Sequence, residues 1–224
     1  MSKKVFLNAG HGGSDPGAVA NGLKEKDLNL TIALSCRDEL KRHGVTVYMG
    51  RSTDADRTSS QIIEVCNSCG ASIAVDIHNN AGGGDGAEVY YYSGGGKSKE
   101  LANAILAEIV KHGQNSRGAK TRVGSDGTDY YYFIRETVPP AVIVECAFLD
   151  NKTDVKIIDT TAEQKKFGVA IAKGILKQLG IAYKAPATTK PAATTNKTEK
   201  TEKAYHVDIE KLKKDGYTSI VIDI

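Results

Sequence analysis

The chain has 224 residues, 40% of them hydrophobic, and its 30 Lys and Arg against 27 Asp and Glu give a net charge of +3. This length accommodates one well-packed domain with a small appendage, and so small a net charge does not favour a nucleic-acid partner. No apolar run approaches the roughly 20 residues that a membrane-spanning helix needs, so we expect no membrane insertion.

The N-terminus begins Met-Ser-Lys-Lys and continues with Val-Phe-Leu-Asn-Ala. This apolar run is too short, and too soon polar, for the hydrophobic part of a secretory signal. We therefore expect the chain to be made in the cytoplasm without a signal peptide, and to stay there unless something else releases it.

Residues 1–182 alternate short β-rich runs with helical patterns, which predicts an α/β fold with a mainly parallel sheet. In chain order, the expected strands are 5–9, 45–49, 71–77, 87–92 and 141–146. The expected helices are 26–43, 59–69, 97–113 and 162–179. We predict a single three-layer domain in which helices flank a mostly parallel twisted sheet.

Residues 183–203 shift to Ala, Thr, Pro and Lys without apolar periodicity, which predicts a linker. Residues 204–224 show the pattern of a strand, a short helix and a second strand, and they are too few to fold on a core of their own. We expect this C-terminal segment either to belong to a truncated module or to associate with a second copy of itself.

Four cysteines occur, and Cys66 and Cys69 have the spacing of a zinc knuckle or a redox pair. A structural zinc site needs a second pair of ligands with similar spacing, and the sequence has none. A redox pair should lie between a strand and the helix after it, whereas this pair lies late in an expected helix. We expect reduced thiols, and keep a thiol enzyme as an alternative.

Four polar residues lie where predicted strands end or the first helix begins. His11 follows the first strand, His78 follows the third, Glu145 lies in the run 141–146, and Glu25 precedes the first helix. Binding crevices of parallel α/β sheets lie outside the carboxyl ends of the strands. Two His and a carboxylate suit a catalytic zinc ion, and they also suit cobalt or manganese. From residue type and position alone, a metal site and unrelated polar residues both remain open.

The chain resembles the zinc-dependent N-acetylmuramoyl-L-alanine amidases of bacterial autolysins and phage endolysins. The resemblance rests, in order, on Gly10-His-Gly-Gly-Ser-Asp-Pro-Gly-Ala18, Gly22-Leu-Lys-Glu-Lys-Asp-Leu-Asn-Leu30, Ile77-His-Asn-Asn-Ala81, Gly86-Ala-Glu-Val-Tyr90 and Pro140-Ala-Val-Ile-Val-Glu-Cys-Ala-Phe-Leu149. Two positions depart from the family pattern, Asp76 before the second histidine and Cys146 after the glutamate. Of these, Asp76 is expected to alter hydrogen bonding around a ligand.

The resemblance implies one Zn²⁺ in the catalytic domain, held by His11, Glu25 and His78, with Glu145 as general acid/base. It also implies Arg135 and Asn80 as residues that contact substrate. The expected substrate is peptidoglycan, cut at the amide between N-acetylmuramic acid and L-alanine. The expected setting is a phage or prophage endolysin that reaches the cell wall after release, and the C-terminal segment would then suit a wall-binding module.

Three alternatives stay open. In the first, the chain is a host autolysin of the same activity. In the second, it is a zinc amidohydrolase that acts on small acylated amino acids or muropeptides. A non-catalytic wall-binding protein is disfavoured, because such a protein is expected to lack the carboxylate of Glu145.

Overall fold

A computed structural model describes residues 3–186, so the predictions for 204–224 and most of the linker lie outside the described residues. Within them, one compact unit extends to Ala185. Its strands are β1 (Lys4–Ala9), β2 (Val19–Ala20), β3 (Leu23–Lys24), β4 (Thr46–Met49), β5 (Ile73–Asn80), β6 (Ala87–Tyr91), β7 (Ser116–Lys120) and β8 (Ala141–Phe148). Its helices are α1 (Glu25–Arg42), α2 (Ser59–Ser68), α3 (Gly96–Lys111), α4 (Tyr132–Glu136), α5 (Lys152–Val155) and α6 (Thr161–Gln178).

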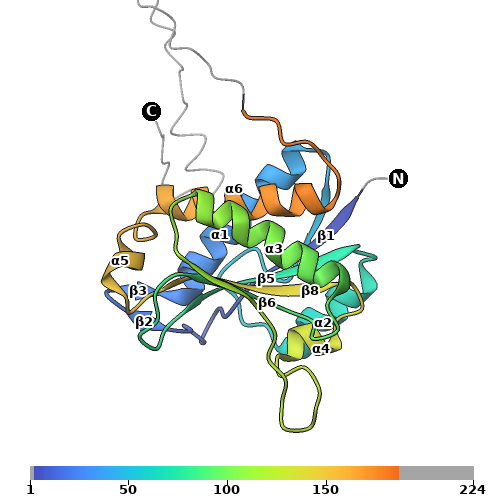
Figure 1. Ribbon diagram of the computed structural model, residues 1–224, viewed down its shortest axis with the longest axis horizontal. Coiled ribbons are helices and arrows are strands. Elements are labelled where there is room, and N and C mark those ends of the chain that lie inside the picture. Colours follow the sequence, from blue (N-terminus) through green and yellow to red (C-terminus); the bar gives the residue numbers. More distant parts are fainter. Residues whose placement is uncertain (1–2, 187–224) are drawn as a thin grey trace, which may run out of the picture. The chain divides into compact units, whose positions relative to one another are not determined.

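The main sheet has six strands in the order β4-β1-β5-β8-β6-β7. All neighbours are parallel except β6 and β8, which run antiparallel. Helices α1, α3 and α6 cover one face, and α2 and α4 lie on the other (Figure 1). The predicted three-layer α/β fold with a mostly parallel sheet is therefore confirmed. None of the described helices is long and apolar enough to cross a membrane.

Alternating side chains of the central strands fill two cores, because successive residues of a strand point to opposite faces. In β8, Val142 and Val144 join the larger core beneath α1, α3 and α6. Ala141 and Ile143 join the smaller core beneath α2 and α4. By this alternation Glu145 points to the same face of the sheet as Ala141 and Ile143, the face covered by α2 and α4. It follows these two core residues along β8.

The structure adds elements that the sequence patterns did not predict. β7 has the sequence Ser-Arg-Gly-Ala-Lys, without an alternating apolar pattern, because it is an edge strand of the sheet. The five residues of α4 and the four of α5 are too few to show helical periodicity. One boundary also differs: Glu25 is the first residue of α1 rather than a residue before the helix.

Candidate metal centre and active site

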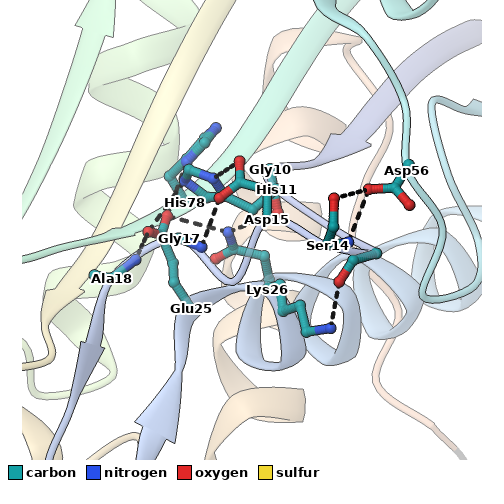
Figure 2. A network of polar contacts seen from close by, with 12 residues as sticks. Gly10, His11, Ser14, Asp15, Gly17, Ala18, Glu25, Lys26, Asp56 and His78 are labelled. Atoms are coloured by element: carbon teal, nitrogen blue, oxygen red, sulfur yellow. Dashed lines mark hydrogen bonds and ion pairs between the residues drawn. The ribbon is translucent and has the colours of Figure 1, made fainter.

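Three side chains predicted as metal ligands converge at the carboxyl ends of β1 and β5 (Figure 2). His11 follows β1, His78 belongs to β5, and Glu25 opens α1. Glu25 Oε2 lies 3.1 Å from His11 Nε2, and Glu25 Oε1 lies 2.9 Å from His78 Nδ1. Each residue offers one ligand atom, and the three atoms lie within 4.8 Å of one another.

Two glycines allow this convergence. A Cβ on Gly10 would stand 2.1 Å from Cε1 of His78, so the ring packs directly on the backbone there. A Cβ on Gly17 would stand 2.5 Å from Glu25 Oε2, and Gly17 has a φ of 64° that disfavours other residues. The glycines of the first motif therefore make room for the imidazole and the carboxylate.

Hydrogen bonds fix the orientation of the three side chains. Asp15 Oδ2 lies 2.7 Å from His11 Nδ1, which leaves His11 Nε2 facing Glu25. Asp76 Oδ2 lies 3.4 Å from His78 Nε2 and leaves Nδ1 facing the cluster. The expectation that Asp76 affects hydrogen bonding around a ligand agrees with this contact. Carboxylates behind ligating imidazoles are the usual partners that orient such rings.

The carboxylate of Glu25 is held by backbone and side-chain donors as well. The backbone N–H of Ala18 donates to Oε2 at 2.9 Å, and that of Asn79 donates to Oε1 at 3.1 Å. Asn29 donates to Oε1 at 3.2 Å. The side chain is almost fully buried, so these donors hold its two oxygens toward the histidines.

Arg51 connects the segments that carry His11 and Glu25. The residue is 3% exposed, and its guanidinium donates to the carbonyl oxygens of Ala9, Gly10, Thr53 and Lys26 at 2.7 to 3.1 Å. Gly10 precedes His11, and Lys26 follows Glu25. The bonds to these two carbonyls therefore tie the loop after β1 to the first turn of α1.

The electrostatics of the cluster suit a dication. Although burial opposes it, hydrogen bonds from His11 and His78 hold the pKa of Glu25 well below its usual range. The hydrogen bond to Glu25 raises the pKa of His11, and Asp76 and Glu25 raise that of His78 despite burial. The neighbouring carboxylates therefore stabilise positive charge at the two imidazoles. Two imidazoles and one carboxylate are a ligand set of catalytic zinc ions, so the residues fit that metal.

Glu145 lies beside this cluster, because its Cα pairs with that of His78 in the β5–β8 ladder. Burial raises the pKa of Glu145 to about 7, against an opposing effect of His78. On its other side, Glu145 pairs with Glu88 of β6. A carboxyl group with such a pKa can both accept and donate a proton near neutral pH.

The two residues predicted to contact substrate lie outside the cluster of His11, Glu25 and His78. Asn80 ends β5 and donates to Glu88 Oε1 at 3.1 Å. Arg135 is on α4, where it donates to the carbonyl oxygen of Asp129 at 2.8 Å and to Glu136 at 2.9 Å. Sequence reasoning missed Asp15, Arg51 and Glu88. Of these, Arg51 could have been found, because it comes shortly after the carboxyl end of β4.

A cavity of about 550 Å³ adjoins the cluster on the α2 side. It is lined by His11, His78, Asn8, Asp76 and residues that include the first turn of α2. The two Cys-x-x-Cys thiols are not part of this site: Cys69 donates to the carbonyl oxygen of Cys66, and both are free cysteines.

Comparisons with known proteins find relatives over most of the chain. The family model described as N-acetylmuramoyl-L-alanine amidase matches residues 5–177. The N-acetylmuramoyl-L-alanine amidase CwlM of Bacillus licheniformis is 33% identical over 191 residues, covering 84% of this chain and 73% of that protein. The endolysin of Bacillus phage SPP1 is 33% identical over 193 residues, covering 82% of this chain and 69% of that protein. The catalytic domain of the amidase CwlV from Bacillus (Paenibacillus) polymyxa var. colistinus has a TM-score of 0.72 at 32% identity, covering 80% of this chain and 99% of that structure.

Proposed function

The chain belongs to the N-acetylmuramoyl-L-alanine amidase family, and from that membership we propose that it is a zinc-dependent hydrolase of peptidoglycan. The bond cut is the amide that joins the lactyl group of N-acetylmuramic acid to L-alanine. The observation that carries this proposal is the convergence of His11, Glu25 and His78 beside Glu145.

We propose that His11, Glu25 and His78 hold one zinc ion per catalytic domain. When bound, such an ion polarises a carbonyl oxygen and lowers the pKa of a water molecule toward about 7. Asp15 and Asp76 keep the two imidazoles turned toward the ion by their hydrogen-bonding contacts. Glu25, with its pKa held low, remains a carboxylate and balances part of the positive charge.

Glu145 moves the proton in this mechanism. It accepts a proton from the attacking water while the water oxygen forms a bond to the lactyl carbonyl carbon. The carbon–nitrogen bond then breaks, and Glu145 delivers the proton to the nitrogen of the departing L-alanine. The products are a muramoyl carboxylate and a peptide with a free amine. The pKa of about 7 lets one residue serve both transfers.

Two further roles are proposals of the same kind. Asn80 contacts substrate from the end of β5, close to Glu88. Arg135 supports the wall of the site by holding the segment before α4. We also propose that residues 183–203 link the catalytic domain to a separate C-terminal segment, and that this segment binds the bacterial cell wall or a second copy of the chain.

The setting is a phage or prophage endolysin, with a host autolysin as the alternative; the relatives include a phage endolysin and a bacterial N-acetylmuramoyl-L-alanine amidase, LytC of Bacillus subtilis. Transcription of the gene on prophage induction would support the endolysin, and transcription during ordinary growth would support the autolysin.

The mechanism is tested with purified peptidoglycan and three variants. We expect Glu145→Gln to keep one zinc per chain. Its kcat should fall by a factor of about 10² to 10⁴, the range usual for the loss of a general acid/base. His11→Ala and His78→Ala should lose both zinc and turnover. Near-normal turnover in Glu145→Gln would contradict the assigned role, and full zinc content in His11→Ala would contradict the ligand set.

A further inference from the structure

A group of basic side chains lies on the β6–β7 side of Glu145. Glu88, the β6 partner of Glu145, is 3% exposed, and its Oε2 accepts from Arg117 Nε at 2.8 Å and Lys120 Nζ at 2.5 Å. Its Oε1 accepts from Asn80 and from the hydroxyl of Tyr90. One buried carboxylate therefore holds two partly exposed cations next to the proposed proton carrier.

A third cation, Arg122, continues this surface just beyond the end of β7. Its guanidinium lies 3.7 Å from the ring centroid of Tyr130 and 5.8 Å from that of Tyr131. Among residues 3–186, no carboxylate lies within ion-pair distance of Arg122. We call Arg117, Lys120 and Arg122 the β7 cationic surface; its three positive charges outnumber the negative charges of Glu88 and of Asp85 near Arg117.

Aromatic rings connect this surface to the catalytic side of the sheet. The ring of Tyr131 lies 4.7 Å from that of Tyr90, whose hydroxyl donates to Glu88 at 2.9 Å. Arg117 lies 4.8 Å from the ring of Phe148 at the end of β8. Arg122 therefore belongs to a continuous set of contacts that reaches the immediate neighbour of Glu145.

The other side of the catalytic cluster has the opposite charge. The cavity of about 550 Å³ is lined by the carboxylates of Asp15, Asp56 and Asp76, and Arg57 is its single Lys or Arg. Its volume lies in the range that holds a small ligand. The site thus has a basic surface on one side of the reacting groups and an acidic cavity on the other.

The proposed substrate is asymmetric in the same way. On one side of the scissile amide stands an N-acetylated sugar without charge. On the other stands the stem peptide, whose second residue is linked onward through its side chain and has either a free or an amidated α-carboxyl group. A free carboxylate is matched by guanidinium and ammonium groups and is repelled by carboxylates.

We propose that the β7 cationic surface binds the α-carboxylate of the second stem-peptide residue, while the cavity beside α2 receives the muramyl sugar. This inference rests on the proposed function and adds the orientation of the substrate, with its peptide over β7 and its sugar beside α2. It also gives the chain a preference for stem peptides whose second residue is an acid rather than an amide.

The test uses two small fragments that differ in one group: N-acetylmuramoyl-L-alanyl-γ-D-glutamyl-L-lysine, with a free α-carboxylate on the second residue, and N-acetylmuramoyl-L-alanyl-D-isoglutaminyl-L-lysine, in which that group is an amide. For the zinc-loaded full chain we expect kcat/KM to be about tenfold higher for the acid, the size of one charge-assisted hydrogen bond. Arg122→Gln should lower kcat/KM for the acid much more than kcat/KM for the amide. Arg122 is the first choice because it contacts aromatic rings rather than Glu88, so the variant should fold.

Two further variants make the outcome decisive. In the double variant Lys120→Gln with Arg122→Gln, the two fragments should be cleaved equally, and cleavage of the amide reports that it is folded. Arg57→Gln is the matched control in the cavity and should keep the tenfold preference.

Equal cleavage of both fragments by the unaltered chain, or a preference that survives in Arg122→Gln and in the double variant, would overturn this inference alone. A preference lost only in Arg57→Gln would place the peptide over the cavity and also overturn it. Cleavage of neither fragment, with zinc bound and peptidoglycan intact, would instead count against the proposed function.

Discussion

The contact between Gly10 and His78 gives a sharp prediction about metal binding. A Cβ on Gly10 would stand 2.1 Å from the His78 ring, whereas ordinary contact begins at 3.4 Å. In Gly10→Ala the imidazole must therefore move by more than about 1 Å, and the tolerance of a metal–ligand distance is about 0.2 Å. Gly10 does not have a positive φ, so the added methyl group acts on His78 and not through backbone strain.

The expected loss can be estimated from milder changes. Removing a residue that hydrogen-bonds to a metal ligand lowers metal affinity about 10- to 100-fold. Displacing the ligand itself should therefore lower it at least about 100-fold. A 100-fold loss corresponds to about 2.7 kcal/mol, which is also the loss of zinc-induced stabilisation at saturating metal. Without metal, Gly10→Ala should differ less from the unaltered chain, because moving His78 then disturbs its contacts with Glu25 and Asp76 but breaks no bond to a metal.

The assay is a competition titration with a zinc chelator, together with unfolding in the presence and absence of zinc. Gly124→Ala is a matched control: Gly124 also has no positive φ, and its Cβ would meet only the carboxylate of Asp126 within 3 Å. Zinc affinity of Gly10→Ala within threefold of the unaltered chain would refute the assignment of His78 as a ligand.

Two further predictions concern the residues behind the ligands. Asp15→Asn removes the charge that faces His11 Nδ1 at 2.7 Å, so zinc affinity should fall about 10- to 100-fold in the same titration, and an unchanged affinity would contradict a role for Asp15. Arg51→Lys replaces a guanidinium group that donates to four carbonyl oxygens by a single ammonium group. In urea unfolding of the metal-free chain, the free energy of unfolding should fall by about 3 to 5 kcal/mol. A decrease below about 1 kcal/mol would show that these hydrogen bonds contribute little to stability.

Much of the fold could be predicted because its core elements have strong patterns. The run 141–146 is apolar on both faces since β8 lies between β5 and β6 beneath helices on each side. β7 could not be predicted, because it is a polar edge strand whose residues serve a neighbouring buried carboxylate rather than a core. Its position explains why the cationic residues near the site escaped sequence reasoning.

The candidate site could be predicted only as a set of residues, not as a geometry. The strand-end rule brought His11 and His78 to one edge of the sheet, since β1 and β5 are parallel neighbours. It could not give the orientation of the rings, which depends on Asp15 and Asp76. The place of Arg51 after β4 could have marked it as a candidate, but its role depends on carbonyl groups of three separate segments, which no local sequence pattern reveals.

The most direct test of the central claim is mass spectrometry of the fragments released from purified peptidoglycan, with and without a chelator. We predict free peptides that begin with L-alanine, absent after chelation and restored when zinc is added back. Peptides that remain joined to muramic acid despite added zinc would contradict the proposed cleavage.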